Sequence, residues 1–237
     1  MLKRINAFLS IKDGCFTRTR NFYPDHLYSS FHLDTELFDE LTFIDISGGE
    51  DRVQFVAYLK KILKNSFLPV SVGGGIINLE DCELFFDLGV DRIVINTILW
   101  NNPKLVEKIS LRYGSQAIVA SVDIIKAEGS HYSAYDWKSK KAYKDFFPEI
   151  IINEKNLIGE IMIQSYDRDG TILGFDHEIT DKINEKEVND IPLNIASGFA
   201  KWEHYYEVLK KPTIDCVSVQ NVHHLSAVSI DSLKRYC

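Results

Sequence analysis

The chain has 237 residues, of which 45% are hydrophobic, and its formal net charge is −7. This length suits one barrel or one large α/β domain, and the apolar content can fill a sizeable core, which excludes a disordered chain. The negative charge argues against nucleic acid and membrane surfaces as partners, because phosphate groups repel such a field. The basic segment 137–144, "WKSKKAYK", could attract a phosphate locally, but a solvated loop is the favoured interpretation.

Cysteine and histidine spacing predicts no cofactor and no metal. The cysteines at positions 15, 82, 216 and 237 form no Cys-x-x-Cys pair, so neither a redox motif nor structural zinc is supported. The adjacent histidines of "VHH" (222–224) would point to opposite sides of an extended segment. Without a leader peptide or a long apolar run, we expect a cytoplasmic protein with reduced thiols.

Eight short apolar runs recur along the chain. They are rich in Val, Ile and Leu without strict alternation, which is typical of strands covered on both faces. Amphipathic stretches such as 51–66 and 78–89 lie between them and predict helices. This alternation indicates a (β/α)₈ TIM barrel formed by one domain, 1–237. The alternative is an open doubly wound sheet. The runs are 5–11, 41–47, 68–74, 92–97, 117–124, 160–166, 192–198 and 215–221.

An internal repeat divides this expected barrel into half-barrels of roughly 1–115 and 116–237. The segments "DELTFIDIS", "LPVSVGGGI" and "DRIVINT" of the first half correspond to "GEIMIQSYD", "IPLNIASGF" and "DCVSVQN" of the second. An offset of about 120 residues is half a barrel and indicates duplication. The matched pairs are Glu40 with Glu160, Pro69 with Pro192, Gly74 with Gly198 and Asn96 with Asn221.

The same alignment singles out Ser10. Aligning "NAFLSIK" with "VASVDII" places Ser10 opposite Asp123, each near the end of the first strand of its half. Barrel active sites lie at the carboxyl ends of the strands, so both positions are candidates for chemistry. One half would supply a hydroxyl and the other a carboxylate.

Glycine-rich segments after the strands predict anion sites. In the first half, the glycines of "SVGGGI" let backbone amides approach a phosphate, although a tight turn alone would also explain them. The first candidate site comprises Gly74, Gly75, Asn96 and Thr97. The second comprises Asp169, Gly170, Ser197, Gly198 and Asn221, where the bulk of Phe199 and Gln220 crowds the space that a phosphate needs.

Six motifs together resemble the cyclase subunit family of imidazole glycerol phosphate synthase, over nearly the whole chain. They are "KDG" (12–14), "VGGGI" (72–76), "INTILWNNPKLV" (95–106), "RYGSQAIVASVD" (112–123), "DRDGT" (167–171) and "IASG" (195–198). The resemblance implies a duplicated barrel that binds a substrate with two phosphates. It also implies a glutaminase subunit as partner in a heterodimer, which supplies ammonia for closure of the imidazole ring.

The resemblance assigns roles to particular residues. Asp123 matches the general acid/base aspartate, whereas its partner carboxylate on strand one falls at Ser10. A serine hydroxyl has too high a pKa to replace it near neutral pH. Gly75, Asn96 and Thr97 match the first phosphate site, and Gly170 and Ser197 match the second, where Phe199 replaces a glycine.

The opposite end of the barrel matches the family's ring of charges through which ammonia passes. The matching residues are Arg4, Glu40, Arg92 and Glu160, and Asp91 matches a residue at the glutaminase interface. A structural salt-bridge plug is the alternative interpretation of the ring. The first connection, 23–41, lacks the family's Gly-Asp-Pro turn and its longer helix.

The sequence therefore predicts a barrel that conducts ammonia but has diverged at its reactive end. This combination resembles paralogues associated with acetamidino-modified sugars of bacterial lipopolysaccharide, in a phosphorylated or nucleotide-sugar pathway. Three alternatives remain. One is a genuine cyclase, a lyase of histidine biosynthesis, and another is a scaffold without catalysis. The third, an aldose–ketose isomerase barrel, is less favoured.

Overall fold

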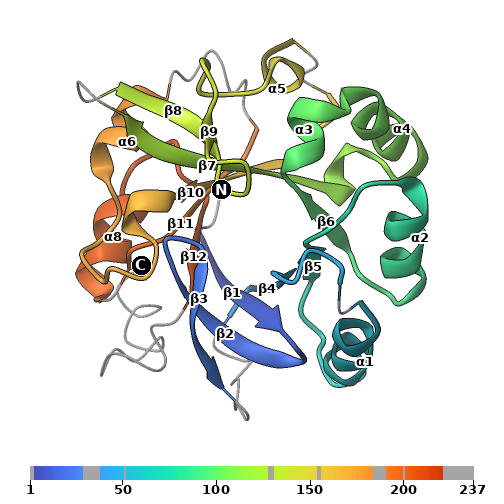
Figure 1. Ribbon diagram of the computed structural model, residues 1–237. Coiled ribbons are helices and arrows are strands. Elements are labelled where there is room, and N and C mark those ends of the chain that lie inside the picture. Colours follow the sequence, from blue (N-terminus) through green and yellow to red (C-terminus); the bar gives the residue numbers. More distant parts are fainter. Residues whose placement is uncertain are drawn as a thin grey trace.

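Eight parallel strands close into a barrel in the computed structural model, which describes residues 3–28, 38–50, 52–127, 131–153, 156–183, 191–199 and 201–220 (Figure 1). Neighbours pair in the order of the chain, β12 pairs with β1, and β10 pairs with both β7 and β11, so these eight strands leave no open edge. The (β/α)₈ prediction is confirmed and the open sheet is wrong. The strands are β1 (Arg4–Lys12), β4 (Glu40–Asp45), β5 (Val70–Gly73), β6 (Arg92–Ile95), β7 (Ile118–Ala127), β10 (Glu160–Ser165), β11 (Leu193–Ala196) and β12 (Cys216–Val219).

Helices surround the barrel (Figure 1). In the expected helix 78–89, Asn78 accepts a hydrogen bond from the backbone N–H of Asp81 at 2.8 Å, a cap that starts α2. None of the described helices is long and apolar enough to cross a membrane. The helices are α1 (Arg52–Leu63), α2 (Leu79–Asp87), α3 (Thr97–Asn101), α4 (Pro103–Tyr113), α5 (Glu149–Asn153), α6 (His177–Lys182) and α8 (Trp202–Leu209), with 3₁₀ turns η2 (Ser115–Ala117) and η4 (Tyr166–Arg168).

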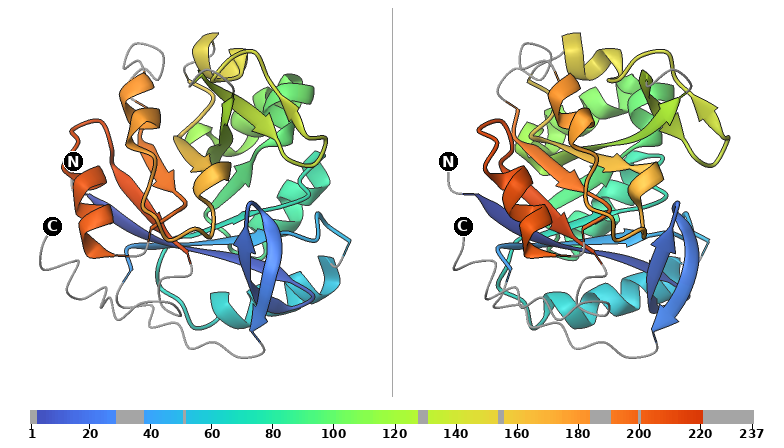
Figure 2. Two further views of the ribbon diagram at one scale, coloured as in Figure 1. Left: turned by 60° about the vertical axis from the view of Figure 1, so that its left-hand side comes forward. Right: turned by 90° about the vertical axis from the view of Figure 1, so that its left-hand side faces the viewer.

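Two antiparallel ribbons extend the first strand of each half. β1 continues into β2 (Cys15–Arg20) and β3 (Tyr23–Tyr28), and β7 continues into β8 (His131–Asp136) and β9 (Lys141–Ala142). Both ribbons stand at the end of the barrel opposite the start of β1 (Figure 2). The connection 23–41 thus begins with the strand Tyr23–Tyr28, and residues 29–37 lie outside the described residues.

Two apolar cores explain why the strands lack strict alternation. The larger core lies between the strands and the helices, where α1 contributes Phe55 and Leu59. A separate core fills the inside of the barrel with Phe8, Val94, Val119, Met162 and Ala196, next to Ile44. Because both faces of the strands are covered, apolar residues occupy positions of either parity.

Candidate functional site

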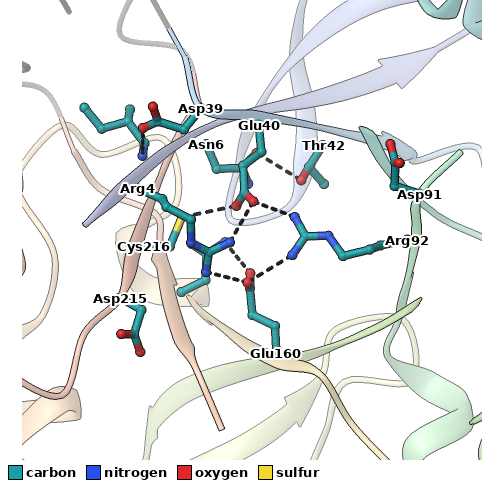
Figure 3. Close-up of polar contacts among 12 residues, drawn as sticks. Arg4, Asn6, Asp39, Glu40, Thr42, Asp91, Arg92, Glu160, Asp215 and Cys216 are labelled. Atoms are coloured by element: carbon teal, nitrogen blue, oxygen red, sulfur yellow. Dashed lines mark hydrogen bonds and ion pairs between the residues drawn. The ribbon is translucent and has the colours of Figure 1, made fainter. Parts of the chain in front are cut away.

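Four charged side chains form a closed ring at the N-terminal mouth of the barrel (Figure 3). Oε2 of Glu40 lies 2.7 Å from the Arg4 guanidinium and 2.6 Å from that of Arg92. Oε2 of Glu160 lies 2.6 Å and 3.1 Å from the same two guanidinium groups. Each carboxylate thus bridges both arginines. The four residues that the sequence grouped are in direct contact.

The second oxygen of each carboxylate is also satisfied. Asn194 donates a hydrogen bond to Oε1 of Glu160 at 3.0 Å, and the Cys216 thiol donates to Oε1 of Glu40 at 3.3 Å. Burial alone would lower the pKa of Arg4, but Glu160 and Glu40 outweigh it and leave that pKa above its ordinary value. Every carboxylate and guanidinium group of the ring is therefore paired, the condition under which buried charges are tolerated.

Asp91 is one of three aspartates that brace neighbouring strands at this end. Its Oδ2 accepts a hydrogen bond from the backbone N–H of Val70 at 2.7 Å. Asp39 and Asp215 likewise accept a hydrogen bond from a backbone N–H of the preceding barrel strand. Asp39 accepts from Ile5 at 2.8 Å, and Asp215 accepts from Leu193 at 3.1 Å. All three acids stand directly before a strand (Figure 3). Asp91 thus has a structural role beside the interface role expected of it.

A buried polar layer lies directly above the ring, and the sequence analysis missed it. Asn6 donates to Ser218 at 2.8 Å and accepts from Thr42 at 3.1 Å, while Ser218 donates to Asn194 at 2.8 Å. All four side chains are buried. The sequence does carry a pattern that could have predicted the layer. Asn6, Thr42 and Ser218 each stand two positions after the first residue of their strand, in β1, β4 and β12.

At the opposite end, a cavity of about 310 Å³ opens at the carboxyl ends of the strands. It brings together six of the predicted site residues from both halves of the barrel. The inner apolar core, through Phe8 and Val94, forms its floor, and the two ribbons contribute Phe22 and Trp137 to its walls. The predicted residues that line it are Ser10, Gly74, Gly75, Asn96, Thr97 and Asp123.

Asp123 lines this cavity as a buried carboxyl with a raised pKa. Burial raises the pKa of its carboxyl to about 7, although a hydrogen bond from Asn96 at 2.9 Å opposes the rise by favouring the ionised form. The Gln164 amide lies 3.4 Å from the other oxygen and donates to Ser121 at 3.0 Å. Sequence reasoning missed Gln164, a polar residue in the apolar run of β10.

The glycines of "VGGGI" are required by close backbone packing. Gly74 and Gly75 have φ angles of +99° and +63°. A Cβ atom on Gly74 would lie 2.1 Å from the Asp45 carbonyl oxygen, and one on Gly75 would lie 2.4 Å from that of Gly48. Arg52 donates to the carbonyls of Gly74 and Gly75 at 3.0 and 2.9 Å. The turn is thus fixed before any ligand binds.

The described residues of the predicted second phosphate site do not line this cavity, although the neighbouring Gln220 does. Asp169, Gly170, Ser197 and Gly198 are absent from its described lining, and Asn221 lies outside the described residues, as does "VHH". A Cβ on Gly170 would lie 2.3 Å from the Thr19 carbonyl oxygen. The glycine therefore allows the backbone of the β2–β3 ribbon to pack closely against this segment.

Phe199 is buried where the resemblance expects a glycine. Its ring stacks at 4.5 Å on Tyr205 and at 6.0 Å on Phe175, measured between centroids. Beside it, the Gly174 backbone N–H donates to the Gly198 carbonyl at 2.7 Å. This part of the second half is packed as core, which agrees with the crowding inferred from the sequence.

The "DRD" segment instead holds both ribbons. Oδ2 of Asp169 accepts from the backbone N–H of Phe22 at 2.9 Å, at the turn of β2–β3. Oδ2 of Asp167 accepts from the backbone N–H of Lys126 at 2.7 Å, near the end of β7. Burial raises the pKa of Asp169 to about 6, and that hydrogen bond from Phe22 opposes the rise. Two aspartates of one segment thereby anchor equivalent ribbons of the two halves.

The chain is thus a closed (β/α)₈ barrel with a pocket at the carboxyl ends of its strands. Barrels of this class carry their active sites at that face. Within this class, the chain belongs to the histidine biosynthesis protein family, which matches residues 9–228.

Several curated relatives carry the name imidazole glycerol phosphate synthase subunit HisF. The relative from Chlorobium phaeovibrioides is 33% identical over 243 residues, which cover 100% of this chain and 96% of the relative. Those from Natranaerobius thermophilus and Hydrogenobaculum sp. are 31% and 30% identical with the same coverage.

Proposed function

We propose that this chain is the ammonia-conducting barrel subunit of a glutamine amidotransferase complex, with a glutaminase subunit bound at its N-terminal mouth. The paired ring of Arg4, Glu40, Arg92 and Glu160 carries the proposal, because it sits at the axis of the barrel with each carboxylate bridging two arginines. The name of its relatives, subunits of a synthase, favours a partner.

We further propose that ring closure has been lost. Ser10 occupies the position of the first acid/base carboxylate, and losing such a group typically costs on the order of 10²–10⁴ in rate. The lining of the cavity includes the first glycine site and omits the described residues of the second. Ammonia would then serve a separate enzyme, and acetamidino modification of bacterial surface sugars is the acceptor chemistry that we propose.

Complementation tests the loss of cyclase activity. A histidine auxotroph lacking its cyclase subunit should fail to grow without histidine when it expresses this chain together with a matching glutaminase. The subunit from Chlorobium phaeovibrioides, expressed at the same level, is the positive control. Robust growth with this chain would contradict the divergence and favour the genuine cyclase.

The genuine cyclase remains the second candidate, and Asp123 is the observation that favours it. A carboxyl whose pKa is raised to about 7 by burial suits general acid/base catalysis near neutral pH. Restoring the first acid with Ser10→Asp separates the candidates: a weakened cyclase should gain activity by tenfold or more, whereas the diverged subunit should stay inactive. Ser121→Asp, which adds a carboxylate to the same cavity, is the control.

Partner binding needs its own measurement. Mixing the chain with its glutaminase should raise glutamine hydrolysis, and reversing one ring charge with Glu40→Lys should reduce this stimulation. Absence of binding and stimulation by every glutaminase encoded in the same genome would contradict the amidotransferase proposal.

A further inference from the structure

Ser71 on β5 carries a buried hydroxyl that has no partner in the part of the chain that the structure describes. The residue is 1% exposed, and its Oγ makes no hydrogen bond to a described residue. Its neighbours Val70 and Val72 belong to the larger core, between the strands and the helices. Because successive side chains of a strand point to opposite faces, the Ser71 hydroxyl points into the barrel. A buried polar group without a partner is uncommon and calls for a ligand.

Ser71 adds a fifth strand to the polar layer above the ring. In the register of the sheet, it stands opposite Thr42 of that layer on one side and opposite Arg92 of the ring on the other. Adjacent strands lie about 4.8 Å apart, so the hydroxyls of Ser71 and Thr42 are neighbours. The consecutive strands β11, β12, β1, β4 and β5 thus each place one polar side chain in the lumen.

The polar layer keeps hydrogen-bonding capacity that its own contacts do not use. Its hydrogen bonds run in one direction, from Thr42 through Asn6, Ser218 and Asn194 to Glu160. An amide nitrogen carries two hydrogens, and the hydrogen bonds among the described residues use one hydrogen each from Asn6 and Asn194. Carbonyl and hydroxyl oxygens also have two lone pairs each. The layer can therefore bind a small ligand without losing its own contacts.

The charges beneath the layer favour a neutral ligand. All four carboxylate oxygens of Glu40 and Glu160 already have partners, because Oε2 of each bridges both arginines and Oε1 of each accepts a further hydrogen bond. On the other side of the layer, the inner apolar core begins with Phe8 and Val94. A cation at this level would find no unpaired carboxylate to replace its hydration.

We propose that Ser71 and the polar layer bind one molecule of neutral ammonia inside the barrel, between the charged ring and the inner apolar core. This inference rests on the proposed function and deepens it, because it gives the conduit a holding site. Ammonia accepts one hydrogen bond through its lone pair, which the Ser71 hydroxyl can donate. Its N–H groups donate to oxygens such as those of Thr42 and Asn6. The ligand needs only the space of about one water molecule, roughly 30 Å³.

A holding site at this level divides the desolvation of ammonia into two steps. In the first step, hydrogen bonds to Ser71 and the polar layer replace those to water. In the second, the molecule enters the inner apolar core, where it has no hydrogen-bonding partner. The layer thereby keeps ammonia at the entrance of the apolar part of the lumen.

Ammonia titration of the full chain, followed by NMR, tests the proposal. The side-chain amide signals of Asn6 and Asn194 report on the site. Above the pKa of ammonium, we expect ammonium chloride to shift both signals saturably, whereas sodium chloride at the same pH should not. Well below that pKa, the two salts should act alike, because only the cation is present. Unchanged signals, or equal shifts with both salts above that pKa, would overturn the ammonia site.

The groups around the site do not confuse this pH comparison. The ionisable side chains that face the layer are the four of the ring and the Cys216 thiol. Burial raises the pKa of the Cys216 thiol well above its ordinary value, so this thiol stays protonated over the range compared. The sodium chloride titration at each pH controls for any change in the ring itself.

Removing the unpartnered hydroxyl tests the role of Ser71. Ser71→Ala should weaken ammonia binding by tenfold or more, because it removes a donor to ammonia and leaves the hydrogen bonds of the polar layer in place. Ser133→Ala is the matched control, since Ser133 is a buried serine on the ribbon strand β8, outside the lumen. It should bind ammonia as the parent chain does. Equal affinity for Ser71→Ala and the parent chain would overturn the assignment of Ser71.

Failure of this inference is distinguishable from failure of the proposed function. Glutaminase stimulation depends on the ring and the partner subunit, whereas the ammonia titration uses the chain alone. A chain that stimulates a glutaminase while both amide signals ignore ammonia would overturn the holding site only. A chain that binds ammonia and stimulates no glutaminase would contradict the amidotransferase proposal only.

Discussion

At the scale of single residues, Asp123 shows what burial does to a carboxyl. Desolvation raises its pKa to about 7, from an ordinary value of 3.8, while Asn96 stabilises the ionised form through a hydrogen bond. Between those two values the folded protein binds a proton that the unfolded chain releases. Folding stability therefore falls as pH rises from about 4 to about 7 through this group.

Replacing the carboxyl removes that dependence. Asp123→Asn should be stabilised relative to the parent chain by an amount that grows to a few kcal/mol between about pH 4 and pH 8, because each pKa unit is worth about 1.4 kcal/mol. Urea unfolding of both chains across this pH range measures the difference in their free energies of unfolding. Asp169, whose pKa is also raised, is present in both chains, so its contribution cancels in that difference. A difference that stays constant with pH would show that Asp123 keeps an ordinary pKa in the folded state.

Ser10 could be placed from the sequence and its surroundings could not. The repeat predicted that Ser10 and Asp123 share one end of the barrel, and both line the cavity. Gln164 escaped notice because no motif marks it, and Lys138 was expected in a solvated loop, within the basic segment 137–144. They reach the cavity only through strand register and through the ribbon that β8 and β9 form.

At the scale of elements, the two ribbons are the part of the fold that the sequence did not predict. The eight barrel strands contain unbroken apolar runs, whereas β2 and β3 include Arg18, Arg20 and Asp25 and resemble a polar loop. Their anchoring explains why "DRD" has two acids: Asp169 holds the turn of β2–β3, and Asp167 holds the start of the second ribbon.

Each aspartate should protect its own ribbon. Asp169→Ala leaves the backbone N–H of Phe22 without its acceptor, so amide hydrogen exchange should rise severalfold across residues 15–28. Asp167→Ala should raise exchange near Lys126 and β8 instead. Hydrogen exchange with mass spectrometry compares the two variants, and each serves as the control for the other. Equal changes in both ribbons would contradict separate anchoring.

At the scale of the whole molecule, the charged ring connects strands that are distant in the chain. Arg4, Glu40, Arg92 and Glu160 come from β1, β4, β6 and β10, and their ion pairs cross the axis of the barrel (Figure 3). The sequence predicted this set because the resemblance marked each position. It did not predict the polar layer above, whose residues are not among the matched pairs of the repeat and meet only because β4, β1, β12 and β11 are neighbours.

Removing one charge of the ring should lower global stability. Glu160→Gln leaves two arginines facing a single carboxylate, and we expect a loss of about 3 kcal/mol in the free energy of unfolding. Glu207→Gln breaks an exposed pair with Lys210 and should cost less than about 1 kcal/mol. Urea denaturation measures both. Equal small losses would show that the ring contributes no more than a surface pair.

The apolar belt inside the barrel, formed by Phe8, Val94, Val119 and Met162, has a consequence for whatever crosses the lumen. An ammonium ion that entered this belt would lose its hydration with no polar group to replace it, which costs a large free energy. Neutral ammonia carries no charge and pays a much smaller desolvation cost. On the proposed route, ammonium must leave its proton at the inlet. Nitrogen delivery should therefore decline in acid while the protein is still folded, which gives the conduit a pH limit independent of either enzyme that it joins.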